Sequence, residues 1–177
     1  MCIRDSLFVV YLPLVKLIAK VNIINFFSGL KQALLFAFST SSSSATIPIT
    51  LNNLEKSFNV KKKVSSFTVP LGATINMDGT AIMQGMATIF IANFYGIELI
   101  FTDFLTIILT AALASIGTAG VPGVGMIMLG MVLNQVGLPL EGIAIVMGVD
   151  RLLDMLRTSL NVAGDATVTL LINKLEK

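Results

Sequence analysis

The sequence of 177 residues contains no histidine, no tryptophan and only one cysteine, Cys2. A single cysteine excludes a disulfide framework and a cysteine-based metal site, and the absence of histidine removes the commonest metal ligand and proton shuttle. Charge is scarce as well, because Asp, Glu, Lys and Arg make up 12% of the residues, whereas a soluble domain carries about 25%. Hydrophobic residues reach 55% and the mean hydropathy is +0.88. This composition indicates a membrane protein, and the net charge of +2 gives no indication of a nucleic-acid partner.

Polar, glycine and proline residues interrupt the hydrophobic runs, so few stretches reach the 18 apolar residues of a plain spanning helix. The main interruptions are the serine-rich segment 39–44, the segment 76–80 (NMDGT) and the glycine-rich segment 117–123. Irregular backbone at membrane depth is tolerated only where it is buried in protein or lines a cavity. Repeated interruptions are typical of the broken helices and hairpins of secondary transporters.

Two of these interruptions resemble each other. Aligning Pro48 with Pro122 places SATIP over TAGVP, and each unit precedes a helix with an Asn and an Asp. The pattern predicts two structural repeats, with chance similarity as the alternative.

Lysines fall near the first two turns and the C-terminus, whereas the loops 98–103 and 137–141 contain no basic residue. The positive-inside tendency then places the lysines in the cytoplasm and those two loops outside, so that two re-entrant hairpins enter from opposite sides as gates.

Five polar residues recur at helical spacing in the last apolar stretch: Asp150, Asp154, Arg157, Asn161 and Asp165. At about 100° per residue they span an arc of roughly 80°, so one helix face carries them all. Each ionisable group in a membrane segment costs at least about 2.5–3.5 kcal/mol on insertion scales. The stripe therefore predicts a pathway for an ion or a substrate.

The charges of the stripe suit a particular substrate. The guanidinium of Arg157 is a rigid fork of donors that matches a carboxylate, and Asp154 can bind an ammonium. Together they would hold a zwitterion with an additional acid group; the alternative is an internal ion pair between the two side chains. Asn76, Asp78 and the polar end of the stripe offer hard oxygen ligands for sodium, and the alternative for the 76–79 segment is simple helix capping.

Four strings carry a family resemblance: SSSSATIP (41–48), LGATINMDGT (71–80), SIGTAGVPG (115–123) and DRLLDMLRTSLNVAGD (150–165). In order and spacing they closely resemble the glutamate/aspartate transporter family, the dicarboxylate/amino acid:cation symporters. The resemblance extends from about Tyr11 to the C-terminus. As a set the motifs are specific to that family.

The resemblance implies an all-α multi-pass membrane protein with broken transmembrane helices and two oppositely oriented re-entrant helical hairpins in an inverted repeat. The expected segments are a non-native start with the truncated end of a transmembrane helix at 1–20, re-entrant hairpin 1 at 21–57, broken transmembrane helix 7 at 62–94, re-entrant hairpin 2 at 102–137 and transmembrane helix 8 at 140–175. Residues 21–175 would form one transport domain, which in the family slides against a trimeric scaffold. The scaffold helices are absent from this sequence, so we expect the C-terminal portion of a longer homotrimer in a prokaryotic cell membrane.

The resemblance also implies site residues. Those expected to bind the substrate lie around the stripe and the two hairpin tips: Ser42, Ser43, Thr80, Val121, Asp154, Arg157 and Asn161. Arg157 with Thr80 would hold the side-chain carboxylate and Asp154 the amino group. Asn161 and the backbone of Ser42 and Ser43 would hold the α-carboxylate, while Val121 closes over the substrate. Those expected to bind co-transported sodium form three sets: Asp165, Asn161, Asn76 and the Gly72 carbonyl; the carbonyls of Thr74, Ser115, Ile116 and Thr118; and Asn76 with Asp78.

The expected function is sodium-coupled import of L-glutamate or L-aspartate by an elevator-type mechanism, without enzymatic activity. Arg157 favours an acidic over a neutral substrate, and Asp154 favours an amino acid over a dicarboxylate. The alternatives are a C4-dicarboxylate symporter, a proton-coupled glutamate symporter and an incomplete fragment that does not transport. An intramembrane aspartyl protease using Asp78 and Asp165 is disfavoured, because VAGD at 162–165 lacks the expected Gly-x-Gly-Asp.

Overall fold

The computed structural model describes residues 5–116 and 118–176. All regular secondary structure in these two ranges is helical, as the sequence predicts. The elements in chain order are the π-helix η1 (Leu7–Tyr11), α2 (Leu12–Leu17), α3 (Ile23–Thr40), α4 (Ser43–Phe58), α5 (Lys62–Ile75), α6 (Asp78–Phe94), α7 (Phe101–Ser115), α8 (Val124–Gln135), the 3-10 turn η2 (Leu140–Gly142) and α9 (Ile143–Leu175). The predicted non-native start falls largely on residues 1–4, including Cys2, which lie outside the described residues, as does Gly117 of the predicted hairpin 2.

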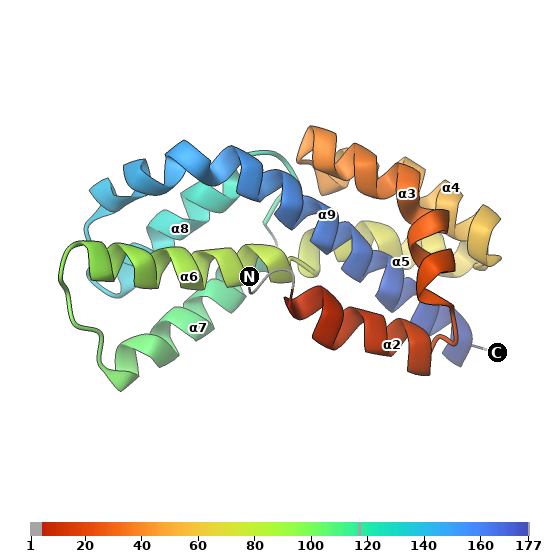
Figure 1. The fold of residues 1–177 in the computed structure, drawn as a ribbon, viewed down its shortest axis with the longest axis horizontal. Helices are drawn as coiled ribbons and strands as arrows, with labels where there is room; N and C mark the ends of the chain where they lie inside the picture. Colours follow the sequence, from red (N-terminus) through yellow and green to blue (C-terminus); the bar gives the residue numbers. More distant parts are fainter. Residues whose placement is uncertain (1–4, 117, 177) are drawn as a thin grey trace.

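The longest helix, α9, organises the rest of the molecule (Figure 1). Its 33 residues correspond to about 50 Å. Helices α2, α3, α4 and α5 pack against its C-terminal part, whereas α6 and α8 contact its N-terminal part and α7 packs on those two. The polar stripe lies where the two groups meet.

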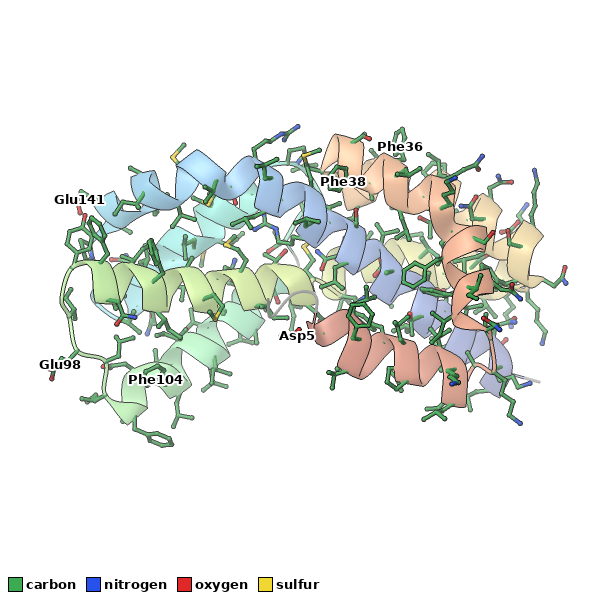
Figure 2. The ribbon with its side chains drawn as sticks, viewed as in Figure 1. Asp5, Phe36, Phe38, Glu98, Phe104 and Glu141 are labelled. Carbon is green, nitrogen blue, oxygen red and sulfur yellow. The ribbon has the colours of Figure 1, made fainter. Side chains whose placement is uncertain are left out.

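Several connections between helices lie at the two ends of the molecule. Figure 2 places Glu98 and Glu141, from the loops that precede α7 and α9, at one end. The α2–α3 turn, the α4–α5 turn and the C-terminus lie at the opposite end (Figure 1). This separation is the one that the lysine pattern predicts. The re-entrant hairpins and the inverted repeat stay predictions, because they are defined relative to a membrane.

Three other connections lie halfway along the molecule (Figure 1), and the first two have a local cause. Helix α3 ends at Ser41, whose backbone is left-handed (φ 52°), and Ser42 caps α4 by accepting the N–H of Ala45. Between α5 and α6, Asn76 and Met77 leave helical geometry, with ψ of 72° and 50°. The third connection runs between α7 and α8. Three chain breaks are thereby brought to the middle of α9 (Figure 1).

Two apolar clusters flank the stripe. One includes Phe26, Leu30 and Leu54 beneath α3 and α4, and the other includes Ile91 and Leu133 between α6, α8 and α9. The outer surface is also apolar, with many large hydrophobic side chains of α3 and α7 exposed. Lipid is as apolar as these side chains, so their exposure is compatible with a bilayer.

Helix α3 alone, among the described residues, combines the length and the apolar composition needed to cross a membrane. Helices α7 and α8 are apolar but shorter. The structure therefore agrees with the prediction that uninterrupted spans are few.

Candidate functional site

The stripe predicted on one helix face is buried in α9. The five side chains belong to residues that are at most 8% exposed: Asp150, Asp154, Arg157, Asn161 and Asp165. Ten consecutive residues, 158–167, include only one that is not fully buried, so this part of α9 is enclosed by the other helices on nearly all sides. A charged face enclosed in this way needs partners, and the structure supplies them from α6, α8, the α5–α6 break and the α7–α8 connection.

Arg157 forms the centre of the site. Its Nη2 donates to Oδ1 of Asp154 at 2.7 Å, and its Nη1 lies 3.7 Å from Oδ1 of Asp150. The guanidinium is 3% exposed, so the pair with Asp154 is a buried, charge-assisted bond. The internal ion pair that the sequence left open is present.

Two glycines allow neighbouring helices to approach Arg157 closely. A Cβ on Gly125 of α8 would lie 2.9 Å from Nη2 and 3.0 Å from Cζ of the guanidinium. A Cβ on Gly79 of α6 would lie 3.0 Å from Cγ of the same side chain. The N–H of Gly79 also donates to Oδ1 of Asn161 at 3.0 Å. Larger residues at either position would displace the arginine.

The α3–α4 connection (residues 41–44) and the α7–α8 connection (residues 118–123) meet beside this ion pair, and we call them the two tips. The hydroxyl of Ser42 donates to the carbonyl of Gly120 at 2.7 Å, and the N–H of Ser44 donates to the same carbonyl at 3.2 Å. The N–H of Gly123 donates to Oδ2 of Asp154 at 3.2 Å. These three bonds join segments 41–44 and 118–123 to each other and to α9.

A cavity of about 20 Å³ remains beneath the tips, which is enough for roughly one water molecule. Six of the seven predicted substrate residues line it: Ser43, Thr80, Val121, Asp154, Arg157 and Asn161. The seventh, Ser42, lies beside the cavity with its hydroxyl bonded to the opposite tip. The structure brings the predicted group together, in a closed arrangement too small for an amino acid.

A second polar group surrounds the break between α5 and α6. The Nδ2 of Asn76 donates to Oδ1 of Asp165 at 3.0 Å, and Gly72 lies so close that a Cβ there would be 2.5 Å from the same oxygen. The hydroxyl of Tyr11 donates to Asp78 and lies 3.5 Å from Oδ1 of Asn76. Four residues of the predicted sodium sets are therefore neighbours.

The remaining sodium set, the carbonyls of Thr74, Ser115, Ile116 and Thr118, stays a prediction, and the hydroxyl side chains among these residues form local hydrogen bonds. The hydroxyls of Ser115 and Thr118 are buried and donate to carbonyls of Ala112 and Ala114, whereas Thr74 is exposed and donates to Leu71. Ile116 is 53% exposed. No cluster of three or more His, Cys, Asp or Glu side chains suited to a metal occurs among the described residues. Any ion here would depend on carbonyl and amide oxygens, which is a donor set that suits sodium.

Tyr11 is a residue of this region that the sequence did not indicate. It belongs to η1, within the segment expected to be a truncated helix end, and it is 4% exposed. Nothing in the local pattern relates position 11 to position 78. The only signal in the sequence was a polar hydroxyl group, that of Tyr11, within an otherwise apolar run.

Residues 5–175 match the sequence profile of the sodium:dicarboxylate symporter family. The chain is similar to an excitatory amino acid transporter of Caenorhabditis elegans (49% identity, 88% of this chain and 31% of the relative) and to excitatory amino acid transporter 1 of Homo sapiens (49%, 89% and 29%). It is 45% identical to excitatory amino acid transporter 3 of Mus musculus over 95% of this chain and 32% of the relative.

The chain thus spans about a third of the length of these relatives. They are animal proteins and lend no support to the prediction of a prokaryotic membrane. The relatives and the family are transporters rather than enzymes, and the resemblance predicted from the four motifs is confirmed. The chain is a member of the sodium:dicarboxylate symporter family.

Proposed function

We propose that this chain is the transport domain of a symporter that imports L-glutamate or L-aspartate together with sodium. The observation that carries the proposal is the buried pair of Arg157 and Asp154 at the wall of a small cavity. Both charges face the same small space, and a ligand that enters it must satisfy both.

An acidic amino acid is the substrate that satisfies this requirement. Its ammonium replaces Arg157 as the partner of Asp154, and its side-chain carboxylate replaces Asp154 as the partner of Arg157. A neutral amino acid would leave the arginine without its second carboxylate, and a dicarboxylate without nitrogen would leave the aspartate unpaired. Leaving one member of a buried charge pair unpaired costs about 2–5 kcal/mol, which corresponds to at least about 30-fold in affinity.

Binding requires the hairpin tips to separate. The three hydrogen bonds of Gly120 and Gly123 hold the tips closed. The two bonds to the Gly120 carbonyl contribute about 0.5–1.5 kcal/mol each, and the bond from Gly123 to the charged Asp154 contributes about 1.5–3 kcal/mol. Opening is therefore thermally accessible on the time scale of transport. We assign the opening to segment 118–123, because Gly123 has a left-handed backbone (φ 82°) and Val121 is already 47% exposed.

Sodium would bind at the α5–α6 break, between the carboxylates of Asp78 and Asp165 and the amide oxygens of Asn76 and Asn161. The apolar outer faces of α3 and α7 suit movement through lipid against a separate scaffold. The same proposal includes an elevator-type motion of the domain, a homotrimeric parent protein and a location in the cell membrane. They concern a longer protein that carries this chain.

The test is uptake of labelled L-aspartate into liposomes that contain the full-length protein. Uptake should require a sodium gradient, and excess L-glutamate should block it, whereas succinate and L-serine should not. Competition by succinate would contradict the role of Asp154, and competition by L-serine would contradict that of Arg157. Uptake driven by a proton gradient alone would contradict the sodium assignment. Blue-native gel mobility of the chain expressed alone would separate an assembled domain from a fragment that cannot fold.

A further inference from the structure

Asp150 is the one stripe residue without a place in the proposed function. It belongs to a helix that crosses the whole domain, and it is 8% exposed. Its Oδ1 is buried and forms no hydrogen bond within the described residues. A buried carboxylate without a bonded partner is costly, so its position requires an explanation.

The explanation lies in what Asp150 faces. Its Oδ1 is 3.7 Å from Nη1 of Arg157, and this nitrogen is also buried without a hydrogen bond within the described residues. The two unbonded atoms thus face each other across a buried ion pair. Seven residues along a helix are nearly two full turns, and helical side chains lean toward the N-terminus. The long arginine side chain therefore extends back past Asp154 to reach Asp150.

The two aspartates differ in their relation to the cavity. Asp154 and Arg157 line it, whereas Asp150 does not. Asp154 also accepts the N–H of Gly123 from the moving tip. A substrate can therefore reach Asp154 and separate it from Arg157, while the contact between Asp150 and Nη1 lies out of its path.

We propose that Asp150 is a positioning residue that holds the guanidinium of Arg157 in place while Asp154 transfers to the substrate ammonium. The inference rests on the proposed function. The guanidinium carries donors on two edges, so the Nη1 edge can stay with Asp150 while the Nη2 edge exchanges Asp154 for the substrate carboxylate. Without Asp150, Arg157 would follow Asp154 and lose its orientation toward the substrate.

The experiment compares L-aspartate with L-asparagine, its neutral isostere, as sodium-dependent ligands of the purified full-length protein. The variant Asp150→Asn should raise the Kd for L-aspartate at least tenfold and change that for L-asparagine less than twofold. Asp150→Glu should restore most of the L-aspartate affinity, because it returns the charge. The matched control Glu141→Gln removes an exposed acid just before α9 and should bind both ligands as the wild type does.

Each outcome decides the matter. Equal weakening of both ligands would indicate a merely structural role, and unchanged binding would indicate no role; either would overturn the inference alone. Failure of the wild type to bind L-aspartate would overturn the proposed function as well. If Asp150→Asn does not fold, Asp150→Glu, which keeps the charge but moves the carboxylate by one methylene, takes its place and should weaken L-aspartate binding more than L-asparagine binding. Equal changes in the two Kd values of Asp150→Glu would also overturn the inference.

Discussion

The close packing of α8 on Arg157 makes Gly125 the most sensitive test of the site geometry. An alanine there would place a methyl carbon 2.9 Å from Nη2 and 3.0 Å from Cζ and Nη1, where ordinary contacts begin near 3.4 Å. The guanidinium is the flexible end of its side chain, so it would move rather than the helix. The displacement needed is about 0.5 Å, enough to disturb a bond of 2.7 Å to Asp154.

The expected effect on binding is large for so small a substitution. Because a 1 Å misplacement of reacting groups costs an enzyme up to about 100-fold in rate, we take about tenfold in affinity as the order of magnitude for half that distance. Gly125→Ala should raise the Kd for L-aspartate by about that factor, measured by calorimetric titration of the purified full-length protein at saturating sodium. Gly125 is the second residue of α8, and overpacking against the buried arginine should also lower the free energy of unfolding by about 1–3 kcal/mol.

The matched control lies on the same helix. At Gly130 an added Cβ would meet Ile143 at 3.5 Å and Leu140 at 3.9 Å, which are ordinary contacts far from the arginine. Gly130→Ala should therefore bind L-aspartate as the wild type does. Wild-type affinity in Gly125→Ala would refute the reasoning, and so would an equal loss in Gly130→Ala.

Two further predictions concern the neighbouring contacts. Gly72→Ala would place a methyl carbon 2.5 Å from Oδ1 of Asp165, so the sodium concentration for half-maximal uptake should rise at least tenfold. In the control Gly85→Ala, the nearest neighbour of the added carbon is 4.0 Å away, so this concentration should be unchanged. In a cysteine-free background, the double variant Ser44→Cys/Gly120→Cys should lose uptake on oxidation and regain it on reduction, because a disulfide would lock the bonded tips. Uptake by the oxidised double variant at the wild-type rate would show that the tips need not separate.

Much of the architecture could be predicted because it depends on local pattern. The spacing of Asp150 to Asp165 is compatible with one helix face, and that face is buried in α9. The NMDGT segment reads as an interruption of an apolar run, and α5 and α6 are separated there by Asn76 and Met77. In both cases the cost of placing polar groups among apolar ones limits the possible structures to very few.

The contacts that close the site could not be predicted, because they join distant parts of the chain. The hydroxyl of Ser42 bonds a carbonyl 78 residues away, and that of Tyr11 bonds a carboxylate 67 residues away. A glycine such as Gly125 gives no sign in the sequence that its missing side chain makes room for an arginine. Nor could the sequence decide whether Arg157 pairs with Asp154, since the spacing permits an internal pair and a ligand equally.

The break between α5 and α6 links the two polar groups physically. Before the break, the side chain of Asn76 bonds Asp165 at the far end of the stripe, and after it the N–H of Gly79 bonds Asn161 beside Arg157. The four residues 76–79 therefore hold both groups, with Asp78 between the two bonded residues. An ion bound to Asp78 and Asp165 would fix the position of Asn161 through this segment. Displacement of Asn161 would in turn shift the side chain of Asp165. Under the proposed function, such short connections make sodium and substrate binding interdependent without requiring any contact between the ion and the amino acid.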